Sequence, residues 1–531
     1  MTRIVCAVGQ ISTQIGRIER GRALQYKCVL VSQISSERVT DLFLVAQTFH
    51  PERWTVCALY VLEKLRTTQV QAFATGNMAN LIPTETDVPS NSNATRNPSG
   101  QGRLAVIFRS LKHRNFRLFF SGQLISLIGT WMQTIAEAWL IYRLTGSSVL
   151  LGLLGFVSQI PIFLLSPIGG LAADRWPRRR VVIATQVASM LLGFTLAALT
   201  LTGRIRVWEI ISLATLLGVV NAFDVPARQS FLIEMVGRED LLNAIALNSS
   251  MFNGARVAGP AVAGLLVARI GEGWCFFANG VSYFAVLAGL LMMHIEHSLV
   301  AHDGSTPIEK LREGLRFVRR AVPIRTLLLL LGLVSFTALP FSVLMPIFAD
   351  RILHGGATAY GNLMLAVGLG AMFGALVLAT RQELRGLGNL VAYSAIGLGV
   401  SLTLFSASRW FWASFAALAM AGFTMMMQFT STNTLIQAMV PDQLRGRVMS
   451  LYSMMFLGMS PLGSLVAGKM AEHIGAPITV ALGGLTSLVG GVIFARKWPS
   501  ARASARDLFA AQGMMRTQSL PKVTSPQEPT A

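Results

Sequence analysis

The chain has 531 residues, of which 53% are hydrophobic and only 13% are charged, and its mean hydropathy is +0.55. These values lie far outside the averages of soluble domains and exclude an ordinary soluble globular protein. The net charge of +20 does not indicate nucleic-acid binding, because the basic residues lie in short loops between apolar runs, where they set membrane topology.

Residues 1–100 differ from the rest of the chain, because they contain no apolar run long enough to span a bilayer and no signal peptide. The stretch from Thr84 to Gly102 is rich in Ser, Thr, Asn and Pro, which is typical of a flexible linker. Met78 precedes this linker, so two interpretations stay open. Residues 1–77 are a genuine cytoplasmic extension, or translation of the native protein starts at Met78.

From Asn115 onward, the sequence contains twelve apolar segments of about 20 residues, each long enough to cross roughly 30 Å of hydrocarbon. Arg and Lys gather in alternate connections, which we expect in the cytoplasm together with both termini. The sequence predicts an all-α membrane protein with one six-helix bundle in 101–306, a linker helix and a second bundle in 307–500, and a tail in 501–531. We expect the spans at 117–143, 148–172, 181–202, 207–227, 245–269, 272–294, 323–350, 359–380, 388–406, 409–431, 446–471 and 476–495.

An internal duplication relates the two bundles. Seven of the ten glycines between Gly169 and Gly271 have another glycine 204 positions later, from Gly170/Gly374 to Gly271/Gly475. Two parallel repeats of apolar spans are typical of a transporter with a central pathway between its halves. Between the repeats, residues 307–320 have apolar side chains at helical spacing opposite a basic face. We expect an amphipathic helix on the inner leaflet there, and a solvated linker helix is the alternative.

The loop after the second span reads Gly170-Leu-Ala-Ala-Asp174-Arg175-Trp-Pro177-Arg178-Arg179-Arg180. It resembles the signature loop of the major facilitator superfamily, G-x-x-x-D-R-x-G-R-[RK], with Pro177 in place of the second glycine. The resemblance implies a latch that joins the two bundles on the cytoplasmic side when the transporter faces outward; simple anchoring of topology is the alternative.

The latch needs partners on other helices. We expect Asp224, near the inner end of the fourth span, to pair with Arg178 or Arg179. Asp174 should face the start of the eleventh span near Gly446, and Gly170 should allow a close helix approach. The expected latch residues are Gly170, Asp174, Arg175, Arg178, Arg179, Asp224 and Arg228.

The segment 223–264, FDVPARQSFLIEMVGREDLLNAIALNSSMFNGARVAGPAVAG, is similar to the branch of this superfamily that contains the enterobactin exporter and macrolide efflux proteins. Within it, Gly259-Pro260-x-x-Ala263-Gly264 is similar to the G-P-x-x-G-G core found in members that export by antiport. Proline removes a backbone hydrogen bond and small residues admit a neighbouring helix. We expect a helix that hinges at Gly259, Pro260 and Gly264, with an ordinary kink as the alternative.

Polar residues within the fifth span are the candidates for cargo binding. Arg256 lies near the middle of this span, where a charge costs several kcal/mol unless it faces a polar cavity or a partner. We expect Arg256, with Asn253 and Asn248, to line a central cavity and attract an anionic or phenolic group of the substrate. A buried structural pair with Asp224 or Glu137 is the alternative.

The first span supplies candidates for ion coupling. Glu137 is either a residue at the membrane interface or a protonatable carboxylate in a partly dry cavity, and Gln133 lies one turn before it. Drug–proton antiporters of the superfamily carry an arginine four residues before a glycine in the fourth span. This chain has Ala214 before Gly218, which removes that route for proton coupling.

No phosphate-binding loop, metal-ligand cluster or Ser/His/Asp arrangement occurs in the sequence, so we expect no enzyme activity and no cofactor. The sequence predicts a secondary transporter of the bacterial inner membrane, a monomer in contact with membrane lipids. It would export a hydrophobic or amphipathic small molecule, drug-like or siderophore-like, by alternating access coupled to protons. A lipid or lysolipid flippase, an importer, or a membrane sensor without transport are the alternatives.

Overall fold

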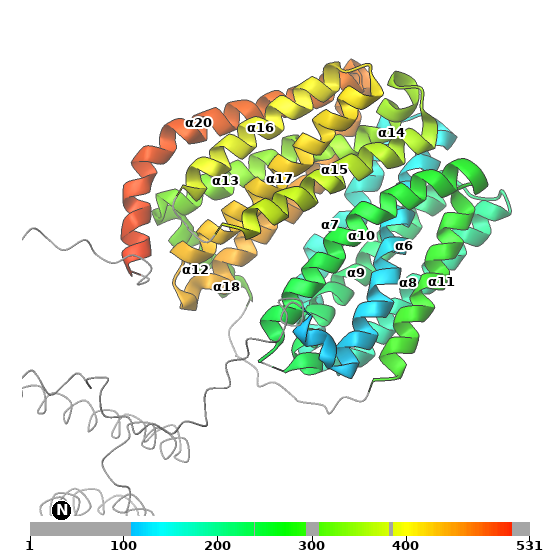
Figure 1. Cartoon of the computed structure of the whole chain (residues 1–531), viewed down its shortest axis with the longest axis horizontal. Helices are drawn as coiled ribbons and strands as arrows, with labels where there is room; N and C mark the ends of the chain where they lie inside the picture. Colours follow the sequence, from blue (N-terminus) through cyan, green and yellow to red (C-terminus); the bar gives the residue numbers. More distant parts are fainter. Residues whose placement is uncertain (1–107, 238, 294–306, 382–385, 512–531) are drawn as a thin grey trace, which may run out of the picture. The chain divides into compact units, whose positions relative to one another are not determined.

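The computed structural model describes residues 108–237, 239–293, 307–381 and 386–511 (Figure 1). The chain divides into two units, Met1–Pro98 and Ser99–Ala531, and every described residue belongs to the second. Across the described ranges the secondary structure is helical, without a strand. Twelve helical segments are long and apolar enough to span a membrane, as the sequence predicts.

The first six spans follow a short 3-10 helix, η3 (Arg109–Lys112), and form the N-terminal half. Helix α6 packs on α10 and α11, α7 packs on α9, and α8 packs on α11 (Figure 1). The spans are α6 (Arg114–Thr145), α7 (Ser148–Arg175), α8 (Arg178–Leu201), α9 (Val207–Val236), α10 (Leu241–Ile270) and α11 (Glu272–Leu291).

The C-terminal half repeats this arrangement, with two of its spans interrupted by 3-10 or π-helical turns. The first interrupted span comprises α13 (Val322–Thr337), η4 (Leu339–Leu344), α14 (Met345–Ile347) and η5 (Phe348–Ile352). The second comprises α18 (Asp442–Ser453), η6 (Met454–Gly458) and α19 (Met459–Ile474). The remaining spans are α15 (Gly356–Ala379), α16 (Leu387–Ala407), α17 (Phe411–Met439) and α20 (Ala476–Ala511).

The duplication is visible at equivalent positions of the backbone. Gly271 and Gly475 end the fifth and eleventh spans with φ of +87° and +83°, a region that L side chains rarely adopt. One boundary differs from expectation, because α20 continues to Ala511, past the tail expected from 501. Its last residues contain Ala and Arg, which are strong helix formers.

The linker between the halves contains the expected helix, α12 (Pro307–Arg320), which packs on α18. A Cβ on Gly314 would lie 2.9 Å from the carbonyl oxygen of Arg447, and Glu313 pairs with the Arg447 guanidinium at 2.5 Å. Val318 is buried while Leu315 is exposed. The side chains of residues 307–311 lie outside the described part, so the expected contact with the inner leaflet stays a prediction.

A cluster of basic groups holds η3 against the start of α10. Asp240 is only 2% exposed and pairs with Arg109 at 2.7 Å, Lys112 at 2.9 Å and His113 at 2.7 Å. Ser110 Oγ also donates to the Asp240 carbonyl. Hydrogen bonds from His113 and Lys112 and the charge of Arg109 lower the pKa of the Asp240 carboxyl to about 2.

Candidate functional site

We name the two ends of the helical unit by their residues. The basic end is where α6, α8 and α10 begin, and the Gly146 end is where α6 terminates at Gly146. The two halves meet through α10 with α15 and through α7 with α19. Their ribbons approach each other near α14 and diverge toward α12 and α18 (Figure 1).

Arg256 lies in the middle of α10 and packs on an aromatic pair. Its Cζ is 5.8 Å from the centroid of the Trp131 ring of α6, and Trp131 makes an edge contact with Phe252 at 5.7 Å. Phe252 and Arg256 are four residues apart and therefore share one face of α10. All three side chains remain at least partly exposed. We call them the Arg256 cluster.

The alternative for Arg256, a buried pair with Asp224 or Glu137, is not found among the described residues. Within the described ranges no ion pair joins Arg256 to a carboxylate, and Asp224 pairs instead with Arg228 at 3.3 Å. The contact with Trp131 compensates part of the desolvation of the guanidinium, on the order of 2 kcal/mol. Arg256 therefore keeps N–H donors for a further partner.

The two asparagines expected beside Arg256 contribute less to this cluster. Asn253 donates through Nδ2 to the carbonyl of Ser249 in its own helix at 2.9 Å. Asn248 is partly exposed, two turns nearer the basic end. The two aromatic residues of the cluster were not among the expected site residues. Phe252 could have been found from its spacing to Arg256, whereas Trp131 depends on how α6 packs against α10.

Glu137 and Gln133 belong to a separate network inside the N-terminal half. Asn279 of α11 donates to Gln133 Oε1 at 2.6 Å, and Gln133 donates to Glu137 Oε1 at 2.7 Å. Ser282 donates to Asn279 Oδ1 at 3.2 Å. Glu137 is only 7% exposed and is therefore buried among the helices of the bundle. Gln133 thus fixes the orientation of this buried carboxylate, and Asn279 fixes the orientation of Gln133.

The Gly146 end is closed by contacts between the halves. A Cβ on Gly361 of α15 would lie 2.6 Å from the Cα of Gly264 in α10, and a Cβ on Gly152 of α7 would lie 2.9 Å from the Cα of Gly468 in α19. Only glycine permits backbones to approach this closely. Gly264 thus supplies the small-residue packing expected of the fifth span, while hinging at Gly259, Pro260 and Gly264 remains a prediction.

Polar groups add to this closure, and sequence reasoning missed them. The Tyr142 hydroxyl donates to Asp350 Oδ2 at 2.8 Å. Arg351 donates to the carbonyl of Gly146 at 3.1 Å, and its Cζ lies 5.8 Å from the centroid of the Tyr142 ring. These contacts join residues more than 200 positions apart. No local motif marks them.

The halves separate toward the basic end. A Cβ added to Gly170, Gly254 or Gly446 would meet nothing within 4 Å. Asp174 and Arg175 are exposed, and Asp174 makes no ion pair among the described residues. The expected contact of Asp174 with the start of α18 near Gly446 is therefore not made in this conformation.

Within the N-terminal half, the latch residues have other partners than expected. Arg178 pairs with Glu234 at 2.8 Å, and Arg179 donates to the carbonyls of Leu290 and Leu291 at the end of α11. Asp224 accepts hydrogen bonds from α8 side chains further along, Thr185 at 2.8 Å and Gln186 at 2.9 Å.

The positions of these residues along the helices explain why Arg178 pairs with Glu234 and not with Asp224. Glu234 follows Asp224 by ten residues, which is about 15 Å along α9. Arg178 begins α8 at the basic end and therefore reaches Glu234 and not Asp224. The close approach expected at Gly170 occurs at Gly169, where a Cβ would lie 2.0 Å from the carbonyl oxygen of Ala222.

Comparison with known proteins identifies the family. The model of the transmembrane secretion effector family matches residues 105–522, most of the chain. The chain belongs to this family of the major facilitator superfamily. It is 26% identical to the staphyloferrin A transporter of Staphylococcus aureus (71% of this chain, 95% of that protein) and to the multidrug efflux pump Tap of Mycolicibacterium fortuitum (69% and 91%). It is 25% identical to the enterobactin exporter EntS of Shigella boydii (72% and 91%).

Solved structures confirm the fold alone. The chain resembles a bacterial homologue of the iron transporter ferroportin with a TM-score of 0.56 and 18% identity, covering 73% of this chain and 99% of that one. This major facilitator protein is therefore a multi-pass membrane transporter of small molecules and not an enzyme. Its candidate functional groups are the Arg256 cluster, the Glu137 network and the two ends at which the halves meet or part.

Proposed function

We propose that this transporter exports a hydrophobic or amphipathic small molecule, drug-like or siderophore-like, by alternating access to a site between its halves. The position of the Arg256 cluster carries the proposal. A Cβ on Gly368 of α15 would lie 3.1 Å from the Cα of Val257, yet a Cβ on Gly254, one turn closer to the basic end, would meet open space. Arg256 thus lies where the contact between the halves ends.

The chemistry of the cluster suits such a cargo. The guanidinium attracts a carboxylate, phenolate or similar acceptor, and the faces of Trp131 and Phe252 suit an apolar or aromatic body. The names of the relatives, a staphyloferrin A transporter, a multidrug efflux pump and an enterobactin exporter, support a small-molecule cargo. The efflux pump and the exporter also support the outward direction.

We place the basic end in the cytoplasm, with both termini on the cytoplasmic side of the bacterial inner membrane, because Arg and Lys concentrate in the loops at that end. In that orientation the halves are in contact at the outer end, so the described conformation is closed to the outside. At the cytoplasmic end the halves are separated. Formation of the latch between Asp174 and the start of α18 would accompany the opposite, outward-open conformation.

Efflux from loaded cells tests the role of Arg256. Arg256→Ala should reduce export of acidic amphipathic compounds at least tenfold, and Arg256→Lys should keep part of the activity because the charge remains. Arg204→Ala is the matched control, since Arg204 is exposed in a loop at the Gly146 end. Equal efflux from all variants at equal membrane abundance would remove Arg256 from the mechanism. Accumulation of cargo, or movement of labelled lipid in vesicles, would favour an importer or a flippase instead.

We further propose that the Glu137 network couples export to proton entry. Glu137 is buried in the N-terminal half, the amide of Gln133 holds its carboxylate in place, and Asn279 holds Gln133. Without the fourth-span arginine of drug–proton antiporters, this chain needs another protonatable group, and Glu137 is placed to change charge as the surrounding helices move.

A further inference from the structure

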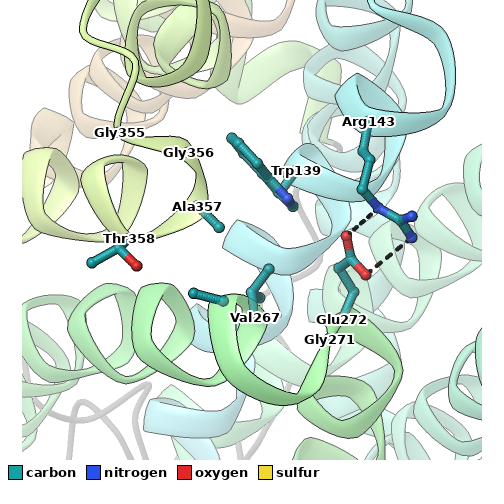
Figure 2. Close-up of a pocket in the computed structure, with 10 residues that line it drawn as sticks. Trp139, Arg143, Val267, Gly271, Glu272, Gly355, Gly356, Ala357 and Thr358 are labelled. Carbon is teal, nitrogen blue, oxygen red and sulfur yellow. Dashed lines mark hydrogen bonds and ion pairs between the residues drawn. The ribbon is translucent and has the colours of Figure 1, made fainter.

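A pocket of about 580 Å³ lies at the Gly146 end, and its walls come from both halves (Figure 2). Trp139 and Arg143 of α6, Ala268 of α10 and Glu272 at the start of α11 form one side. The start of α15, including Ala357, forms the other. This volume can hold a small aromatic molecule, and the pocket is open to its surroundings.

The pocket is separate from the Arg256 cluster. Ala268 follows Arg256 by twelve residues, which is about 18 Å along α10. The backbone contact between Gly264 and Gly361 lies between the two sites. A molecule in this pocket therefore sits on the far side of the closure from the cargo site.

The cationic group of the pocket is Arg143, and its lining also contains the hydroxyl of Thr358 and the carboxylate of Glu272. Arg143 Nε and Nη2 donate to the two oxygens of Glu272 at 2.7 and 3.1 Å, so the carboxylate of Glu272 is already satisfied (Figure 2). Glu272 is 6% exposed in its side chain, whereas Arg143 is 54% exposed and keeps further N–H groups free for a ligand. Helices α11 and α15 both start here without a side-chain cap, which adds backbone N–H donors.

The rest of the lining is apolar and aromatic. Trp139 is held between Tyr142, with ring centroids 5.6 Å apart, and Tyr360, with which it stacks at 6.2 Å. Val267, Ala268 and Ala357 complete the apolar wall. An aromatic body beside Trp139 with an anionic group at Arg143 matches this distribution of donors and apolar surface.

We propose that this pocket binds an amphipathic aromatic anion from the outer side and thereby holds the Gly146 end closed. Because the walls belong to different halves, opening this end pulls them apart, so the ligand binds the closed conformation in preference. Under the proposed function, on which this inference rests, the exported compound itself can be the ligand. Export then slows as its product accumulates outside.

Binding to the purified full-length transporter tests the site without requiring export. The probe is 1-naphthoate, and its affinity is measured by titration calorimetry. The cationic counterpart, 1-naphthylmethylammonium, has a similar size. Wild-type protein should bind the anion at least tenfold more tightly than the cation. Ala268→Trp, which fills the pocket from an exposed position, and Arg143→Gln should each weaken binding of the anion about tenfold or more.

Arg269→Gln is the matched control, since this neighbouring arginine is exposed but does not line the pocket, and it should bind as the wild type does. If Arg143→Gln fails to fold because Glu272 is left unpaired, Arg143→Lys and Ala268→Trp still decide the question. Unchanged affinity in Ala268→Trp, or equal affinity for anion and cation, would overturn the assignment of the site.

The effect on closure needs a second measurement. In proteoliposomes, 1-naphthoate added on the outer side should reduce the rate of cargo efflux severalfold in the wild type and in Arg269→Gln, and much less in Ala268→Trp. Binding without this inhibition would overturn the gating role. Failure of every protein to move cargo would instead refute the proposed function, while the binding result would stand.

Discussion

The contact between Gly361 and Gly264 offers a direct way to shift the conformational equilibrium. In Gly361→Ala, the new Cβ would lie 2.6 Å from both the Cα of Gly264 and the carbonyl oxygen of Pro260. Ordinary contact begins at 3.4 Å, so the helices must separate by about 0.8 Å. Overpacking of this kind costs about 1–3 kcal/mol.

The cost falls on one conformation only, because α10 and α15 make this contact while the Gly146 end is closed. A penalty of about 1–3 kcal/mol changes the ratio of two conformations by about 5- to 150-fold. Gly361→Ala should therefore populate the conformation in which the basic end closes and the Gly146 end opens. Gly254→Ala is the matched control, since it adds the same methyl group to a helix at a position with open space around it.

Spin labels at residues 242 and 442 measure the outcome. Leu242 is the second residue of α10 and is 83% exposed, and Asp442 begins α18 on the other half and is also exposed. With the native cysteines replaced, electron–electron resonance should show one long distance in the wild type and in Gly254→Ala, and an added shorter distance in Gly361→Ala. Identical distance distributions in the three proteins would refute the reasoning.

Four further substitutions probe the polar groups. Glu137→Gln keeps the shape of the network but cannot exchange a proton, so efflux in proteoliposomes should lose its response to an imposed pH gradient; a retained response would clear Glu137 of coupling. Asp240→Asn should lower the unfolding temperature at pH 7. Because its pKa is lowered to about 2 from 3.8, the wild type should keep this stabilisation above pH 4 and lose it as the pH falls toward 2, while the variant shows no such loss. Gln428 is fully buried, and neither of its amide atoms has a partner among the described residues, so Gln428→Leu should raise the unfolding temperature. Gln186→Leu, which removes a hydrogen bond to Asp224, should lower it.

Hydropathy and the repeat predict the architecture because both depend on the residue composition of whole segments and not on the contacts of single side chains. A span needs about 20 apolar residues wherever it lies, so all twelve were found from the sequence. Arg256 could also be singled out, since a charge at that depth needs a reason. Its aromatic support by Trp131 could not, because it depends on the rotation of α6 against α10.

Rotation also explains the smaller errors. Adjacent helical residues point about 100° apart, so nothing in the loop motif decides whether Gly169 or Gly170 faces α9. The structure assigns the close approach to Gly169. Which ion pairs form depends equally on the position of each residue along its helix, as the pair of Arg178 and Glu234 shows. A motif can name the residues of a latch, but their partners depend on relative positions along two helices and on the conformation adopted.

Departures from the repeat indicate that the two halves have unequal tasks. Asp224, bonded to α8 and to Arg228, has Gln428 as its counterpart 204 residues later, and Arg256 has Ser460. At these two positions the N-terminal half thus contains charged groups, one of them the proposed cargo-binding arginine, and the corresponding positions of the C-terminal half are neutral. Neutral side chains at these positions of the C-terminal half have no ion pairs to exchange when the halves move. Transport would then be more sensitive to charge changes in α6, α9 and α10 than to equivalent changes in α13, α17 and α19.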